Sequence, residues 1–140
     1  MHGTSGYLFR FDPRAQTVEV IERITSEPSR RSGMSDSFGY GYLSFALGPD
    51  GRTVYYLTTG PIKDQPHSRT REDVRLVTYD IPSAKYQDHG AVFLSDGQRP
   101  ADIQSIAVVK DGSVYSLATF SRNGQRTADL IHIRASLAAR

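Results

Sequence analysis

Cysteine is absent from this chain of 140 residues. Its absence excludes disulfide frameworks, thiolate metal sites, iron–sulfur clusters and cysteine nucleophiles. No apolar run approaches the roughly 18 residues that a membrane-spanning helix needs, so no membrane span is expected. Residues 1–6 lack the charged and then apolar pattern of a signal peptide, so none is expected there. The sequence does not point to a compartment.

An excess of charge of one sign is also missing. The 17 Lys and Arg residues are nearly balanced by 15 Asp and Glu residues, which leaves a net charge of +2. Nucleic-acid binding needs a clustered positive footprint that displaces counterions, so no nucleic-acid partner is expected. Most of the basic residues are Arg, which suits bidentate contacts to carboxylate or phosphate and makes an anionic ligand one hypothesis.

The motifs of common catalytic and cofactor sites are missing as well. The chain has no G-x-S-x-G elbow, no H-E-x-x-H helix and no phosphate-binding P-loop. Gly39-Tyr40-Gly41 begins like a dinucleotide-binding loop but leads into an expected strand instead of a helix. No two of the four His residues stand at metal-ligand spacing. We expect no cofactor and no metal, and the sequence leaves open whether the chain is an enzyme.

What the sequence does contain is β-strand pattern. Apolar runs predict an all-β chain with strands at residues 7–11, 17–21, 44–47, 53–57, 74–79, 86–94, 104–109, 113–118 and 130–133, and a helical turn at 135–139. Asp50-Gly51 and Asp111-Gly112 predict hairpins, because Gly supplies the positive φ that such turns need. The strand at 74–79 carries Arg75 and is expected nearer water than the apolar strand at 106–109.

Two kinds of hairpin alternate along the chain. Asp50-Gly51 and Asp111-Gly112 each lead into a Val-Tyr strand, while Phe11-Asp12-Pro13 is echoed by Tyr79-Asp80-Ile81-Pro82. A repeat of two hairpins gives four antiparallel strands, which is one blade of a β-propeller. The hairpins resemble those of bacterial β-propeller repeats, such as the lactonase-like, TolB-like and quinoprotein-like families. The resemblance implies a fold and no particular activity, because function resides in sites and not in folds.

The resemblance implies one partial β-propeller domain over residues 1–140. It would contain a half-blade at 6–24, a complete four-stranded blade at 43–94 and a partial blade at 103–134. About two to three blades form an incomplete ring, since propellers have about four to eight. The expected partners are therefore the remaining blades of a larger propeller or copies of the same chain.

The connections between strands suggest where a ligand would bind. The long ones, at residues 25–41, 59–73, 95–104 and 121–129, are all expected on the rim opposite the short hairpin turns. Long loops on one face of a rigid scaffold are typical of a binding surface. The candidate ligand-binding residues are Arg30, Arg31, Asp36, His67, Arg69 and Arg71, a set suited to an anionic or carbohydrate ligand.

Two functions are compatible with these observations. The first is a non-catalytic propeller segment, a scaffold or a module that binds a ligand or protein through its long-loop face. The alternative is a fragment of a propeller enzyme, a lyase or hydrolase of carbohydrates or lactones, with His67 and Arg69 on the active face. Specific catalytic residues cannot be assigned from the sequence.

Overall fold

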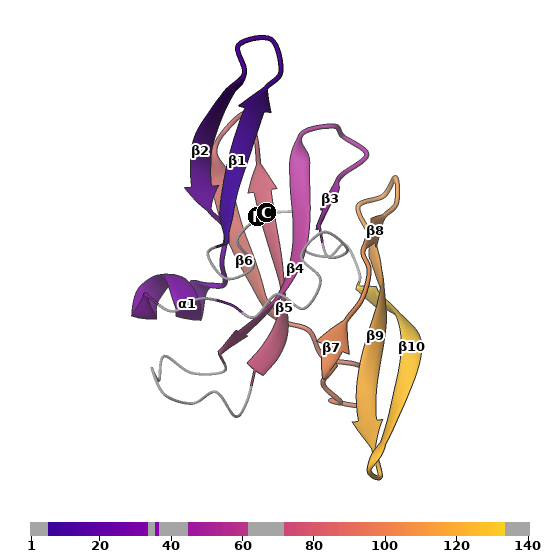
Figure 1. The fold of residues 1–140 in the computed structure, drawn as a ribbon. Helices are drawn as coiled ribbons and strands as arrows, with labels where there is room; N and C mark the ends of the chain where they lie inside the picture. Colours follow the sequence, from indigo (N-terminus) through magenta and orange to yellow (C-terminus); the bar gives the residue numbers. More distant parts are fainter. Residues whose placement is uncertain (1–5, 34–35, 37–44, 62–71, 134–140) are drawn as a thin grey trace.

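Ten antiparallel strands and one short helix form the described part of the computed structural model, which comprises residues 6–33, 36, 45–61 and 72–133 (Figure 1). The all-β class is thereby confirmed. The strands form three sheets. The N-terminal hairpin consists of β1 (Tyr7–Asp12) and β2 (Thr17–Arg23). The middle sheet contains, in this order, β3 (Phe45–Leu47), β4 (Thr53–Pro61), β5 (Glu72–Asp80) and β6 (Lys85–Ala91).

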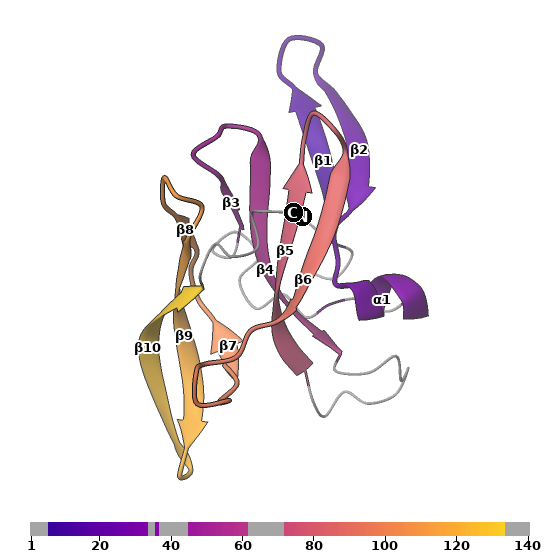
Figure 2. The ribbon, with the colours of Figure 1, turned by 180° about the vertical axis from the view of Figure 1, so that it is seen from behind.

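The C-terminal sheet is built around its longest strands. It contains β7 (Asp102–Ile103), β8 (Ala107–Val108), β9 (Val114–Arg122) and β10 (Gln125–Ile133). Strand β9 pairs with β10 on one side and with both β7 and β8 on the other. Figure 2 shows the same arrangement from behind, with β10 and β6 both visible on this side.

The two predicted Asp-Gly hairpins are confirmed and share their turn chemistry. Asp50 accepts hydrogen bonds from the backbone N–H groups of Arg52 at 3.0 Å and Thr53 at 2.9 Å. Asp111 accepts one from the N–H of Ser113 at 2.8 Å. In each turn, the carboxylate thus fixes the backbone just before the second strand of the hairpin. Both turns lie at the same end of the molecule, and the β9–β10 turn lies at the opposite end (Figure 1).

The connection expected at residues 121–129 is not a long loop. Asn123 and Gly124 form a two-residue turn with φ values of 50° and 76°, and Arg122 pairs directly with Gln125. Positive φ at both central residues is the geometry that an Asn-Gly hairpin turn adopts. Strand β10 therefore begins at Gln125, five residues before the predicted start. Its first five residues are polar except for Ala128, so the apolar alternation of a half-buried strand is weak there.

Of the strand predicted at residues 104–109, only β8 (Ala107–Val108) is regular, and β7 ends at Ile103, before the predicted start. Between them, Ser105 replaces the regular ladder with side-chain contacts: its Oγ accepts from the N–H of Leu117 at 2.9 Å. The backbone carbonyl of Ser105 accepts from the hydroxyl of Ser116 at 2.6 Å. A hydroxyl that bonds to the neighbouring backbone competes with strand pairing, which explains the interruption.

Residues 25–41, expected as a loop, contain the helix α1 (Glu27–Ser32). Ser26 is its N-cap and accepts from the N–H of Ser29 at 3.4 Å, Pro28 lies in the first turn, and Gly33 ends the helix with a φ of 71°. These are ordinary start and stop signals of a helix. The helical turn predicted at 135–139 lies outside the described residues.

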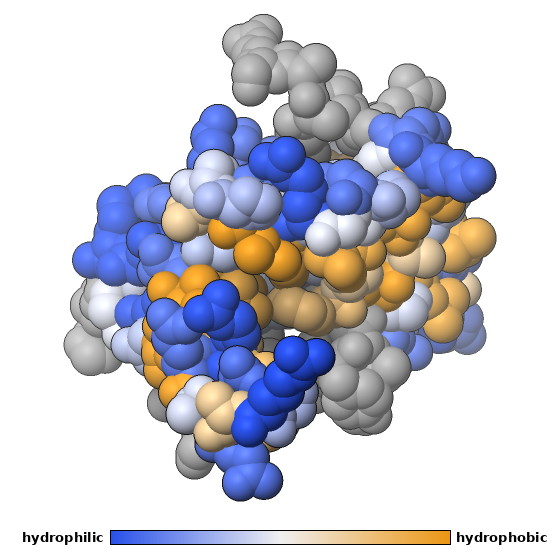
Figure 3. Space-filling model, turned by 90° about the horizontal axis from the view of Figure 1, so that it is seen from above, coloured by the Kyte–Doolittle hydropathy of each residue, from blue (hydrophilic) through white to orange (hydrophobic). Residues whose placement is uncertain are grey.

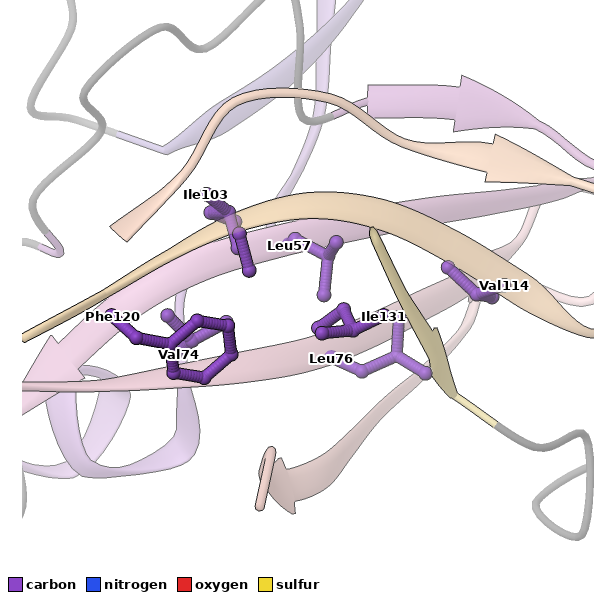
Figure 4. Close-up of a cluster of buried hydrophobic side chains, with 8 residues drawn as sticks. Leu57, Val74, Leu76, Ile103, Val114, Phe120 and Ile131 are labelled. Carbon is purple, nitrogen blue, oxygen red and sulfur yellow. The ribbon is translucent and has the colours of Figure 1, made fainter. Parts of the chain in front are cut away.

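The middle sheet is buried on both faces. On one face, Val54, Tyr56, Val77 and Tyr79 pack with Ile24 and with Leu8 and Ile21 of the N-terminal hairpin. On the other face, Leu57, Val74 and Leu76 pack against Ile103, Val114, Ala118, Phe120 and Ile131 of the C-terminal sheet (Figure 4). The middle sheet therefore lies between the other two.

Two expectations about exposure were wrong. Strand β5, predicted nearer water because of Arg75, is among the most buried strands. Its cation is tolerated because the Arg75 guanidinium pairs with Asp88 at 2.9 Å, and the Asp88 side chain is 1% exposed. The apolar segment at residues 106–109, predicted to be enclosed, is partly exposed, and Val109 is 40% exposed.

Candidate functional site

The C-terminal sheet keeps apolar side chains on the face turned away from the middle sheet. Val114, Ala118 and Phe120 of β9 point into the shared core. Side chains alternate along a strand, so Tyr115 and Leu117 lie on the opposite face. Across the ladder, Leu117 pairs with Leu130, and these two side chains are 38% and 71% exposed.

The outer face of the C-terminal sheet also carries an aromatic pair. The rings of Tyr115 and His132 stack with their centroids 4.7 Å apart and their planes 11° from parallel. We name this outer face, with Tyr115, Leu117, Leu130 and His132, the C-terminal end face.

The N-terminal hairpin has a similar apolar face. Phe9 pairs with Val20, and Phe11 pairs with Val18, so these four side chains share one side of the hairpin. All four are between 47% and 64% exposed. We name this surface the N-terminal end face. Seen from above, hydrophobic side chains lie open between the polar turns of the molecule (Figure 3).

Equivalent positions in the middle sheet are fully covered. The Val54-Tyr55 pair near the start of β4 matches the Val-Tyr pair that begins β9, which aligns Leu57 with Leu117. The register then aligns Leu76, the partner of Leu57, with Leu130. Leu57 and Leu76 are 1% and 3% exposed because the C-terminal sheet covers them. The C-terminal end face thus repeats a pattern that is an interface elsewhere in the same molecule.

The same comparison applies at the other end. The Tyr79-Asp80 step at the end of β5 matches Phe11-Asp12 at the end of β1. Tyr79 is 2% exposed and packs in the core shared with the N-terminal hairpin, whereas Phe11 is 55% exposed. Both end faces therefore carry the side-chain pattern of sheet-to-sheet contacts without a covering sheet among the described residues.

A groove of about 650 Å³ runs between the outer strand of the middle sheet and β10. One wall comes from β5, β6 and the segment after it, the other from the end of β10. Its lining residues are Leu76, His89, Gly90, Ala91, Val92, Phe93, Leu94, Ser95, Ile131, His132 and Ile133. The lining combines apolar side chains with polar surface and contains two imidazole rings, those of His89 and His132.

His89 in this groove is held by one described hydrogen bond. Its Nε2 lies 2.8 Å from the hydroxyl of Thr78, and its buried Nδ1 has no partner among the described residues. Burial lowers the pKa of His89, against the opposing effect of Asp88. The ring is therefore neutral at neutral pH. The contact with Thr78 and the burial account for a structural role of His89.

Of the predicted ligand-binding residues, Asp36 is directed inward. Its carboxylate is buried and accepts from the N–H and hydroxyl of Ser26, both at 2.7 Å, and from the hydroxyl of Thr58 at 2.8 Å. Asp36 thus ties the N-cap of α1 to β4. These described contacts account for a structural role, and a ligand contact stays a prediction.

The two arginines on α1 also make contacts within the protein. Arg30 donates to the carbonyl of Arg23 at 2.7 Å, and its guanidinium lies 4.2 Å from the centroid of the Tyr86 ring. Arg31 forms an exposed ion pair with Glu27 at 3.7 Å. His67, Arg69 and Arg71 lie outside the described residues, so their ligand-binding role stays a prediction.

The charged side chains near the β9–β10 turn largely pair with one another. Arg99 bonds to Asp73 at 2.5 Å, and Arg122 lies 3.2 Å from Asp129 and 3.0 Å from the amide oxygen of Gln98. Within the described ranges, no three His, Asp or Glu side chains form a group that could hold a metal ion. The same part of the chain contains no helix long and apolar enough to cross a membrane.

In the described residues, the geometry defines an all-β arrangement of stacked antiparallel sheets with two open end faces and a groove between β6 and β10. No family model and no curated protein matches the chain. Among solved structures, the chain is similar to the tricorn protease, with 12% sequence identity and a TM-score of 0.48. The similarity covers 89% of this chain and 11% of that chain. Because the sequence identity and the TM-score are both low, no activity is transferred from the tricorn protease to this chain.

Proposed function

We propose that the chain is a non-catalytic segment of a β-propeller that acts as a scaffold and binds neighbouring blades through its two end faces. In this proposal the N-terminal hairpin is the outer half of one blade and the middle sheet is a complete blade. The C-terminal sheet is a blade without its outermost strand. The observation that carries the proposal is the pair Leu117–Leu130, exposed where the equivalent pair Leu57–Leu76 is buried by the next sheet.

The energetics favour coverage of these faces. Burying one large aliphatic or aromatic side chain contributes about 1.5–3 kcal/mol. The N-terminal end face alone offers four such side chains, from Phe9, Phe11, Val18 and Val20. Contiguous exposed apolar surface of this kind marks an interaction site in many proteins. A sheet that packs on either face recovers this free energy, and a soluble ligand of small size does not.

The test is the self-association of the chain in solution. With no other blades present, the end faces can bind only end faces of other copies, so sedimentation velocity is expected to show reversible association that rises with concentration. Leu130→Lys and Phe9→Lys change one end face each and should weaken association about tenfold or more, because each removes one buried apolar contact. Ile81→Lys is the matched control, since Ile81 is 50% exposed but lies on the β5–β6 turn.

Three results would count against the proposal. A chain that stays monomeric at every concentration would show that the end faces are not association surfaces. Equal weakening by all three lysine variants would show a general effect of charge. Reproducible turnover of a polysaccharide or a lactone by the chain would remove the non-catalytic part of the proposal and support the enzyme alternative. Unchanged melting temperatures in the variants serve as the control for folding.

A further inference from the structure

Three strands, one from each sheet, correspond to one another. The match of Tyr79-Asp80 with Phe11-Asp12 aligns Leu76 of β5 with Leu8 of β1. The ladder registers align the same Leu76 with Leu130 of β10, because both pair with equivalent leucines on the preceding strand. Each of the strands β1, β5 and β10 therefore contains one leucine at the same position, and the two sides of the three sheets can be compared.

The two sides of each sheet are distinguished by this leucine and by the residue that follows it, because successive side chains of a strand point to opposite faces. We name the side of the leucine the leucine face and the other side the reverse face. The leucine faces carry Leu8, Leu76 and Leu130, and the reverse faces carry Phe9, Val77 and Ile131.

Both contacts between the sheets join a leucine face to a reverse face. Leu8 of the N-terminal hairpin packs against the core that contains Val77 of the middle sheet. Leu76 of the middle sheet shares the other core with Ile131 of the C-terminal sheet. Among the described residues, no contact joins two leucine faces or two reverse faces. The same rule of pairing is therefore used twice within one molecule.

The two end faces are one of each kind. The N-terminal end face carries the exposed Phe9 and is a reverse face, whereas the C-terminal end face carries the exposed Leu130 and is a leucine face. Each end face of one copy thus finds on the opposite end of a second copy the kind of face that covers its equivalents inside the molecule. Two end faces of the same kind have no counterpart among the contacts between the sheets.

We propose that the N-terminal end face of one copy of this chain binds the C-terminal end face of a second copy, so that the copies associate head to tail. This inference rests on the proposed function, which assigns binding to the end faces but not which of them meet. A head-to-tail contact uses two different surfaces, so each added copy leaves one open face of each kind. Such association continues until a ring closes, or it produces an open filament.

The experiment uses two variants, each of which blocks one end face. The first combines Leu117→Lys with Leu130→Lys, and the second combines Phe9→Lys with Phe11→Lys; all four side chains are exposed, between 38% and 71%. In sedimentation velocity, each variant alone should self-associate at least about tenfold more weakly than the unmodified chain, because only like faces remain. An equimolar mixture should restore the affinity and stop at a complex of two chains, since one complementary pair of faces is intact.

Ile81→Lys adds a lysine on the β5–β6 turn, outside both end faces, and should associate as the unmodified chain does. The same two pairs of substitutions with glutamate repeat the measurement with the opposite charge, and circular dichroism checks the fold of every variant. Dimers of either blocked variant alone, or no complex in the mixture, would overturn the inference, while association of the unmodified chain would leave the proposed function standing. An unmodified chain that stays monomeric would overturn both.

Discussion

Replacing Asp36 with alanine is expected to lower the free energy of unfolding by about 3–5 kcal/mol. The Asp36 side chain is buried, with the residue 2% exposed, and it accepts three hydrogen bonds from Ser26 and Thr58 at 2.7–2.8 Å. These donors lie under α1, at residues that are themselves 0% and 1% exposed.

The magnitude follows from the donors that lose their acceptor. A buried polar group without a partner costs about 1–3 kcal/mol. The backbone N–H of Ser26 cannot turn to another acceptor, whereas the hydroxyls of Ser26 and Thr58 can rotate about their side chains. The N–H thus contributes its full penalty and the two hydroxyls contribute less, which places the sum at about 3–5 kcal/mol.

Urea unfolding followed by circular dichroism measures this loss by linear extrapolation. The matched control is Glu19→Ala, which removes an exposed carboxylate that pairs with Arg10 at 2.6 Å. Such surface pairs contribute about 0–1 kcal/mol, so the control should remain close to the unmodified chain. A loss below about 1 kcal/mol for Asp36→Ala would refute the structural role derived from the three contacts. It would leave the carboxylate available for the ligand that the sequence predicts.

Three further predictions follow from other contacts. Leu57→Ala should cost about 2–5 kcal/mol in chemical unfolding, and Leu117→Ala, at the equivalent exposed position, less than about 1 kcal/mol; equal losses would contradict the difference in coverage. Burial lowers the pKa of His89, so below the ordinary His pKa of about 6.5 the unfolded chain binds this proton more readily than the folded chain. The free energy of unfolding therefore falls as the pH drops through this range. His89→Gln should therefore flatten the fall in melting temperature between about pH 7 and pH 5, and an unchanged slope would refute that cause. The Arg52 guanidinium holds the pKa of Asp80 below its ordinary value, so Arg52→Ala should raise it in an NMR titration, and no change would assign the shift to other contacts.

The hairpins could be predicted because their chemistry is local. An Asp two or three residues before a strand, followed by Gly, fixes the turn through its own side chain, as Asp50 and Asp111 do. The Asn123-Gly124 turn is equally local, and its dipeptide is a strong hairpin signal, but the first residues of β10 lack the apolar alternation that indicates a strand. The helix α1 also had its start and stop residues in the sequence.

Other features depend on residues that only the fold brings together. The burial of β5 is possible because Asp88, on the neighbouring strand, neutralises Arg75. The inward role of Asp36 requires α1 to pack on β4, and no spacing in the sequence indicates this. The groove combines β6 with β10, which belong to different sheets and share no motif. The roles predicted for His67, Arg69 and Arg71 stay predictions.

The strand pairing also determines how the molecule comes apart. In the N-terminal hairpin and the middle sheet, every pair joins strands that follow one another in the sequence. Each of these two sheets is therefore built from neighbouring segments of the chain, which lets order spread from one sheet to the next. The amides of β4 and β5, covered on both faces, are the last to exchange with solvent. Those of β1, β2 and β10 exchange first, so opening of the molecule proceeds from its two ends toward the middle sheet.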